Sequence, residues 1–104
     1  MTLNTAQKKR YRSIGHHLEP VVTVSENGVS EGLVKELNRA LNDHELIKVK
    51  FALMDREERR EIMTALAEEV GAEVVQTIGK IALYLRRAKE QNKKLSNLVR
   101  YSEF

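Results

Sequence analysis

The segment from Val24 to Ser30 combines residue types that could hold a phosphate group. A β-branched run, Val21 to Val24, predicts a strand. Asn27 and Gly28 then supply the conformational freedom of a tight turn, and Ser30 can cap the next helix. Backbone N–H groups and the positive end of a helix converge at such a turn, which suits an anion. Asn27 and Gly28 are therefore candidate phosphate-binding residues.

Basic side chains recur at helical and strand spacings on both sides of this segment. From Gln7 to Leu18, packable residues spaced by three or four predict a helix with one buried stripe and a basic wet face. From Glu45 to Leu53 the pattern has period two, so Lys48 and Lys50 share the outer face of a strand. These lysines either bind phosphates or are simply solvent-exposed residues on an open face of the sheet. The candidate phosphate contacts are Lys8, Lys9, Arg12, His16, Lys48, Lys50, Lys80 and Arg86.

Catalytic and metal-binding constellations are not recognisable in the sequence. Without cysteine there is no disulfide, thiolate zinc site or cysteine nucleophile. Ser25 lacks the flanking glycines of a hydrolase elbow, and His16 and His17 point about 100° apart on a helix. The acids between residues 57 and 69 alternate with arginines, as on a solvated face. We predict no catalytic residue, no metal and no cofactor; a small hydrolase would need a deep pocket with a titratable pair.

Charge is unevenly distributed along the 104 residues, whose formal net charge is +3. Residues 1–18 carry +4, residues 19–79 carry −6 and residues 80–104 carry +5. Segregated positive ends indicate a surface that faces a polyanion, although they could also serve solubility alone. With 41% hydrophobic residues the chain should fold. It contains no stretch that reads as a signal peptide or a membrane span, so we expect a cytoplasmic protein.

The elements that must position these residues alternate between helix and strand. The patterns predict helices near residues 7–18, 30–44 and 55–70, and strands near residues 21–24, 45–53, 74–78 and 81–85. Strand–helix–strand units favour parallel strands, and Gly79-Lys80 predicts an antiparallel hairpin. The fold class is therefore α/β, in the order α-β-α-β-α-β-β, with a four-stranded mixed sheet packed with helices. We expect one domain over residues 1–87 and a basic tail over 88–104, either frayed or partly helical.

The stretches Leu3–Phe51 and Val74–Arg86 resemble the CRM (chloroplast RNA splicing and ribosome maturation) domain, and above all its bacterial YhbY-type members. The most specific match is HELIKVK, which runs from His44 to Lys50. The resemblance implies a fold similar to the C-terminal domain of bacterial translation initiation factor three. It also implies an RNA-binding protein associated with precursors of the large ribosomal subunit.

The sequence departs from the family at the turn after the first strand. Family members usually carry a G-x-x-G loop there, and here Ser25, Glu26, Asn27 and Gly28 keep only the second glycine. Glu26 would repel a phosphate, which moves the expected contacts toward the first helix and the lysine pair. Near the end of the domain, either Arg86 or Arg87 fills the place of the family's arginine.

Aromatic residues are too few for recognition to depend mainly on base stacking. Tyr11 and Phe51 fall at buried positions of the patterns, which leaves Tyr84 as the domain's candidate stacking platform. We therefore expect a monomeric, non-enzymatic protein that contacts the RNA backbone with low sequence specificity. The alternative is an adaptor that grips an acidic protein through the same cationic residues.

Overall fold

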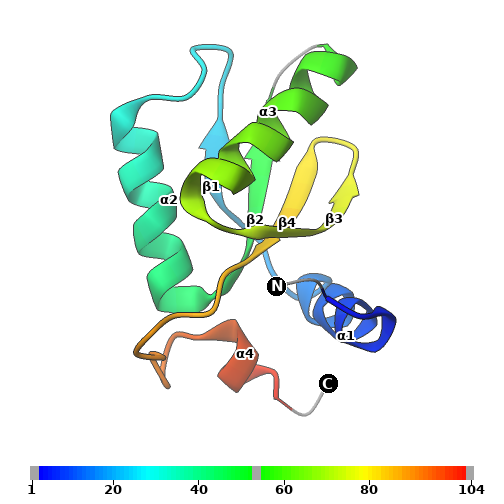
Figure 1. The fold of residues 1–104 in the computed structure, drawn as a ribbon, viewed down its shortest axis with the longest axis vertical. Helices are drawn as coiled ribbons and strands as arrows, with labels where there is room; N and C mark the ends of the chain where they lie inside the picture. Colours follow the sequence, from blue (N-terminus) through cyan, green and yellow to red (C-terminus); the bar gives the residue numbers. More distant parts are fainter. Residues whose placement is uncertain (1–2, 53–54, 103–104) are drawn as a thin grey trace.

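Seven elements occur in the predicted order, and a short helix follows them. The computed structural model describes residues 3–52 and 55–102. Its elements are α1 (Thr5–Gly15), β1 (Pro20–Val24), α2 (Glu31–His44), β2 (Leu46–Phe51), α3 (Arg56–Val70), β3 (Glu73–Ile78), β4 (Ile81–Leu85) and α4 (Asn97–Arg100). The predicted α/β class and the order α-β-α-β-α-β-β are confirmed (Figure 1).

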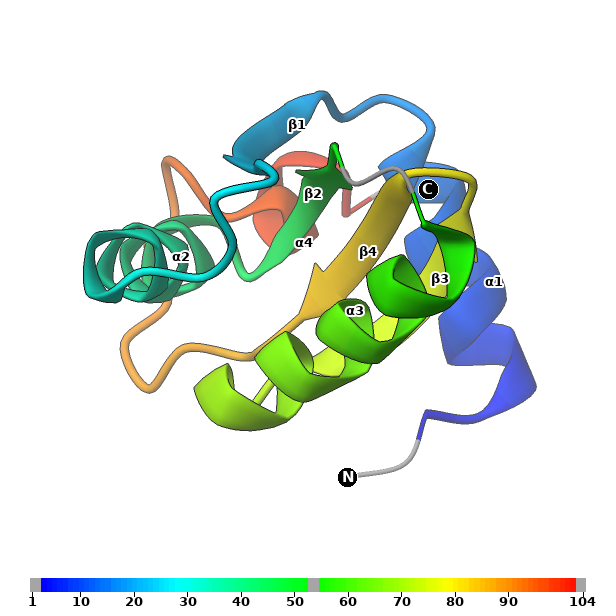
Figure 2. The same ribbon diagram turned by 90° about the horizontal axis from the view of Figure 1, so that it is seen from above.

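The four strands form one mixed sheet in the order β1-β2-β4-β3. β1 pairs with β2 in parallel, and β4 lies antiparallel between β2 and β3. Helices α2 and α3 cover one face of the sheet, while α1 and α4 lie on the other (Figures 1 and 2). The two faces bury separate apolar clusters, one around Phe51 and Tyr84 and the other around Ile14 and Leu83. Because alternate residues of a strand face opposite sides of the sheet, one set packs against α2 and α3 and the other faces α1 and α4.

Alternation along β2 places its lysines on the α1 face. Ile47, Val49 and Phe51 are buried in the cluster beneath α2 and α3, as the period-two pattern predicts. Lys48 and Lys50 consequently point to the opposite face. Leu53, which was expected to continue this pattern, lies outside the described residues.

Local capping explains where the helices begin and end. Asn4 and Gln7 form a reciprocal capping box that starts α1, and the Ser30 side chain accepts the Leu33 N–H at the start of α2. Gly71 ends α3 with φ +68°, a left-handed conformation that favours glycine. α1 ends at Gly15, earlier than the sequence predicts. The His16 N–H still bonds four residues back, but the N–H groups of His17 and Leu18 bond three residues back, and this tighter geometry closes the last turn.

The segment after β4 returns to the domain and packs beside β2. Ser96 and Asn97 are buried, and the Asn97 amide donates to the carbonyl of Leu46 over 2.7 Å. Leu98 and Tyr101 pack against the apolar cluster under α1. These contacts join the segment to the core. The domain boundary at residue 87 remains a prediction.

Candidate nucleic-acid interface

The exposed side of α1 carries a row of cations that leads to the sheet. Lys8, Arg12 and His16 are spaced by four, so they follow one another along one flank of the helix. Tyr11, Ile14 and Gly15 are buried against the sheet, which turns this row and Lys9 to the solvent. Arg12 Nε donates to the Lys8 carbonyl over 3.3 Å, so the guanidinium folds back along the helix. At the end of the row, His16 lies beside the open half of the sheet.

The half of the sheet that α1 does not cover is cationic and partly apolar. Lys48 is half-buried and shares a pocket with His16, whereas Lys50 is exposed further along the same face. Lys80 lies at the tip of the β3–β4 hairpin, where its carbonyl accepts the Phe51 N–H over 2.7 Å. The structure thus brings His16 and Lys48 together, with Lys50 on the same face and Lys80 beside the carboxyl end of β2.

Acidic side chains of the helices and strands gather on one face of the sheet. Among the described residues of α1, α4 and the four strands, the single acid is Glu73, which is half-buried where β3 begins. The acids of the regular elements otherwise lie on the opposite layer, in α2 and α3. They are Glu31, Glu36, Asp43, Glu57, Glu58, Glu61, Glu68 and Glu69. The cations of the α1 face therefore act on a ligand without opposing charges on the helix and strands that present them.

The backbone N–H groups of Asn27 and Gly28 are already hydrogen-bonded within their own turn. Gly28 N–H donates to the Ser25 carbonyl over 2.9 Å, and Asn27 N–H donates to Ser25 Oγ over 3.3 Å. Gly28 has φ +82°, so the second glycine of the family loop keeps its conformational role. With Glu26 exposed beside these donors, the turn is a weaker candidate for phosphate than the α1 row.

The structure places Arg86 away from the other candidate contacts. Its guanidinium donates to both the side chain and the carbonyl of Asn38, to the Val70 carbonyl, and to Asn42 Oδ1, over 2.6 to 2.9 Å. Burial lowers the pKa of Arg86. Its predicted role as a phosphate contact remains a prediction, but these four bonds tie it between α2 and the end of α3.

Replacing Arg86 with alanine is expected to lower the free energy of unfolding by about 2 kcal/mol, because acceptors on α2 and α3 lose a charged donor. RNA binding by the folded fraction should keep its salt dependence. Urea unfolding and filter binding measure the two effects, and the exposed Lys89→Ala provides the control. Unchanged stability together with a shallower salt dependence would instead return Arg86 to the interface.

Tyr84 cannot serve as a stacking platform in this structure, which corrects the expectation from the sequence. Its side chain is fully buried, and its hydroxyl donates to the Met63 carbonyl. Burial raises the pKa of Tyr84, so the phenol stays neutral. Tyr11 and Phe51 are buried, as predicted. The remaining aromatic among the described residues, Tyr101, is half-buried and stacks on His17.

An arginine cluster near the hairpin was missed by the sequence analysis, which assigned these residues to a solvated face. Arg56, Arg59 and Arg60 line a cavity of about 320 Å³ together with Thr77 and Gly79. Their spacing of three and four along α3 is the signal that could have identified them. This cavity places further cations near the Lys80 hairpin, although on the α3 side of the sheet.

Residues 3–52 and 55–102 contain neither a cluster of metal ligands nor a helix suited to a membrane. No group of three or more histidine, aspartate or glutamate side chains is arranged to hold a metal ion there. None of the helices in this part of the chain has the length and apolar character needed to cross a bilayer.

The fold and this surface define a small α/β protein whose sheet presents one cationic face. The chain belongs to the CRS1/YhbY (CRM) domain family, whose sequence pattern matches residues 3–86. It is 52% identical to a probable RNA-binding protein of Pseudomonas aeruginosa, over 98% of each chain. It is 47% identical to an RNA-binding protein of Haemophilus influenzae, over 86% of this chain and 90% of the relative.

A solved structure shows the same fold. The solution structure of a hypothetical protein from Staphylococcus aureus, described as a candidate RNA-binding protein, superimposes with a TM-score of 0.75. The two sequences are 31% identical, and the alignment covers 90% of this chain and 97% of the other. The family suggested by residues 3–86 is thereby confirmed from both sequence and structure.

Proposed function

We propose that this chain is a monomeric, non-enzymatic RNA-binding protein that docks on ribosomal RNA, within precursors of the large ribosomal subunit. Relatives that span nearly the same length are named as RNA-binding proteins, and the CRM domain accounts for most of the chain. The resemblance to YhbY-type members supports the assembly step as the place of action.

The observation that carries this proposal is that, among the described helices and strands, the face that α1 shares carries cations and almost no acids. The row of Lys8, Arg12 and His16 shares one layer with Lys48 and Lys50, and its last member, His16, lines a pocket together with Lys48. The acids of α2 and α3 occupy the other layer. A polyanion can therefore lie across α1 and the open half of the sheet without meeting the acidic helices. Each phosphate that these cations neutralise releases counterions, which gives binding without base specificity.

Filter binding of a large-subunit ribosomal RNA fragment tests this function against that of an adaptor for acidic proteins. With about six phosphate contacts, the logarithm of the binding constant should fall with the logarithm of salt at a slope of about −4 to −5. The comparison ligand is an acidic protein, whose affinity is measured by fluorescence anisotropy. Both ligands are compared at the same two salt concentrations, one low and one near physiological. Tighter binding of the acidic protein at both concentrations would favour the adaptor.

Cross-linking in cells followed by sequencing of the attached RNA tests the ribosomal target. Fragments of large-subunit RNA and its precursors should dominate the recovered sequences. Recovery spread over messenger RNAs, with no enrichment of ribosomal sequence, would contradict the assembly role while leaving RNA binding intact.

A further inference from the structure

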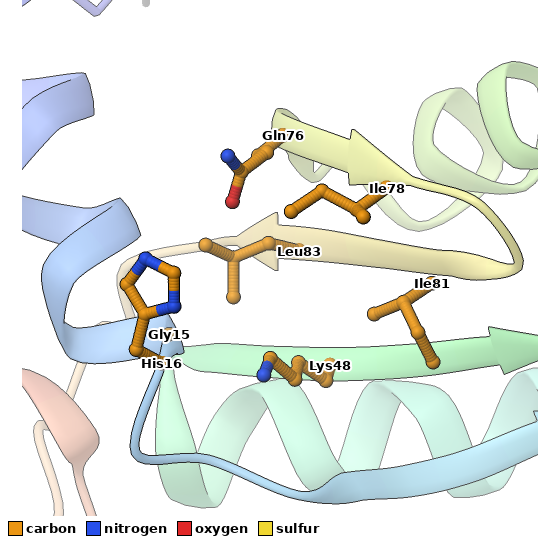
Figure 3. A pocket seen from close by; sticks show the side chains of 7 residues that line it. All are labelled: Gly15, His16, Lys48, Gln76, Ile78, Ile81 and Leu83. Carbon is orange, nitrogen blue, oxygen red and sulfur yellow. The ribbon is translucent and has the colours of Figure 1, made fainter.

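A small pocket opens on the α1 face where the helix meets the uncovered half of the sheet. It has a volume of about 130 Å³ and is lined by Gly15, His16, Lys48, Gln76, Ile78, Ile81 and Leu83. Figure 3 shows the polar side chains of His16, just after α1, of Lys48 on β2 and of Gln76 on β3 around the aliphatic side chains of β3 and β4. The pocket therefore combines an apolar floor with a polar rim.

The apolar floor is set by a close approach between α1 and β4. A Cβ atom added at Gly15 would lie 2.9 Å from Leu83 Cδ2, so glycine is what lets Leu83 pack against the helix backbone. Leu83 is 2% exposed, Ile81 is half-buried, and Ile78 stands 59% exposed at the outer wall. Ile78 thus extends the aliphatic lining of the pocket to the surface, where a ligand can cover it.

The size and the chemistry of the pocket suit one flat ring. A cavity of about 150 Å³ lined by aliphatic side chains accepts a benzene ring in another protein. Here the ring would contact Leu83 and Ile78, as flipped bases contact apolar side chains in other nucleic-acid-binding proteins. The Gln76 amide offers a donor and an acceptor side by side, which can pair with the edge of a base.

The charges around the pocket favour a ring that is attached to phosphates. Lys48 lies on the rim, Lys50 follows two residues along the same strand face, and no residue lining the pocket is acidic. An uncharged aromatic metabolite would make no ionic contact with these lysines, and an acidic peptide would not fill the aliphatic floor. A nucleotide of a single strand can contact the lysines with its phosphate and the floor with its base.

We propose that this pocket receives one unpaired nucleobase of the bound RNA, held between Ile78 and Leu83 and read at its edge by Gln76, while Lys48 contacts the adjoining phosphate. This inference rests on the proposed RNA-binding function and adds a base-contacting site to its backbone contacts. The protein would then prefer a single-stranded segment beside a structured region, because a base inside a helix cannot enter the pocket.

The test compares two probes that have the same phosphates. One is an oligodeoxyadenylate of about eight nucleotides, and the other is an oligomer of the same length built from abasic spacers. The wild-type protein should bind the base-containing oligomer about fivefold more tightly, a factor near the lower end of the range for one stacked base. The corresponding oligoriboadenylate shows whether the 2′-hydroxyls change this preference. Fluorescence anisotropy at low salt measures each affinity.

Two pocket variants and one matched control assign the preference to this site. Ile78→Ala removes the exposed wall and Gln76→Ala removes the amide, and each should bring the fivefold ratio close to one while leaving the affinity for abasic spacers unchanged. Val29→Ala, which removes a similarly exposed side chain far from the pocket, should keep the full ratio. Circular dichroism establishes that each variant is folded.

The possible outcomes separate this inference from the function on which it rests. Equal binding of both oligomers by the wild-type protein would overturn the nucleobase pocket and leave backbone recognition standing. Failure to bind either oligomer or the ribosomal RNA fragment at low salt would overturn the proposed function as well. Loss of affinity for both oligomers in Ile78→Ala would also overturn the base contact, because the abasic oligomer has no base to lose.

Discussion

Replacing Lys48 and Lys50 together with alanine is expected to weaken binding of ribosomal RNA roughly thirtyfold, if each lysine contributes about 1 kcal/mol. Both side chains point from β2 toward the face that α1 shares, and no acid on the neighbouring strands offsets them there. Loss of two phosphate contacts should also make the slope of binding against salt shallower by about 1.4 to 1.8. Filter binding over a series of salt concentrations measures both quantities.

The matched control removes the same charge from the opposite layer. Lys35 and Arg39 are exposed on α2, so Lys35→Ala with Arg39→Ala lowers the net charge equally but leaves the α1 face intact. This control should change affinity far less and keep the salt slope. A second lysine variant, with glutamine at positions 48 and 50, preserves side-chain length on the strand. An unchanged slope in both lysine variants would remove these residues from the interface.

Periodicity explains why this part of the interface could be predicted. Alternation along residues 46–51 fixes Lys48 and Lys50 on one side of the strand, whatever packs there. Helical spacing likewise puts Lys8, Arg12 and His16 in one row. The sequence did not reveal that both sets lie on the same layer, since that depends on which face of the sheet α1 covers. Tertiary packing makes that choice, through the burial of Tyr11, Ile14 and Leu83 in one cluster.

The burial of Tyr84 and the surroundings of Arg86 could not be predicted because the strand order was unknown. β4 lies between β2 and β3 and is covered on both faces, so its Tyr84 is buried like its neighbours. The uninterrupted apolar run Ile81–Leu85 was the signal of such a central strand. Arg86 contacts Asn38 and Val70 only in the folded chain, and no local sequence pattern predicts these long-range hydrogen bonds. The pocket of Gln76 and Ile78 was missed for the same reason, since it is assembled from α1 and three strands.

Glu45 holds the C-terminal segment on the domain. It is 1% exposed, and its carboxylate accepts hydrogen bonds from the Ala88 N–H, the Gln91 amide and the Ser96 hydroxyl. Its backbone has φ +63°, a conformation that non-glycine residues adopt at some energetic cost. The neighbouring His44 adds a bond from Nδ1 to the Leu95 carbonyl over 2.9 Å. The start of the HELIKVK motif therefore has a structural use, in addition to the lysines at its end.

Replacing Glu45 with alanine should lower the free energy of unfolding by about 4 kcal/mol, because the buried Ser96 hydroxyl, the half-buried Ala88 N–H and the Gln91 amide lose their acceptor. Glu45→Gln should cost less, about 2 kcal/mol, since one amide oxygen can still accept. Urea unfolding at neutral pH measures both losses. Glu90→Gln removes an exposed carboxylate from the same segment and should stay within about 0.5 kcal/mol of the wild type.

The stabilisation by Glu45 should disappear in acid. Burial by itself would raise the pKa of this carboxyl, but the hydrogen bonds from Ser96, Gln91 and Ala88, with the charge of Arg87, outweigh it and hold the pKa below the ordinary 4.5. A carboxyl whose pKa is lower in the folded state stabilises the fold above the unfolded pKa, and this contribution is lost as pH falls through the folded pKa. Protonated Glu45 resembles glutamine, so the stability gap between the wild type and Glu45→Gln should be full near neutral pH and narrow steadily below pH 4.5. A gap that is constant from neutral pH into this acidic range would show that the charge of Glu45 does not hold the segment, and Glu45→Ala would then report lost packing and hydrogen bonds that do not depend on the charge.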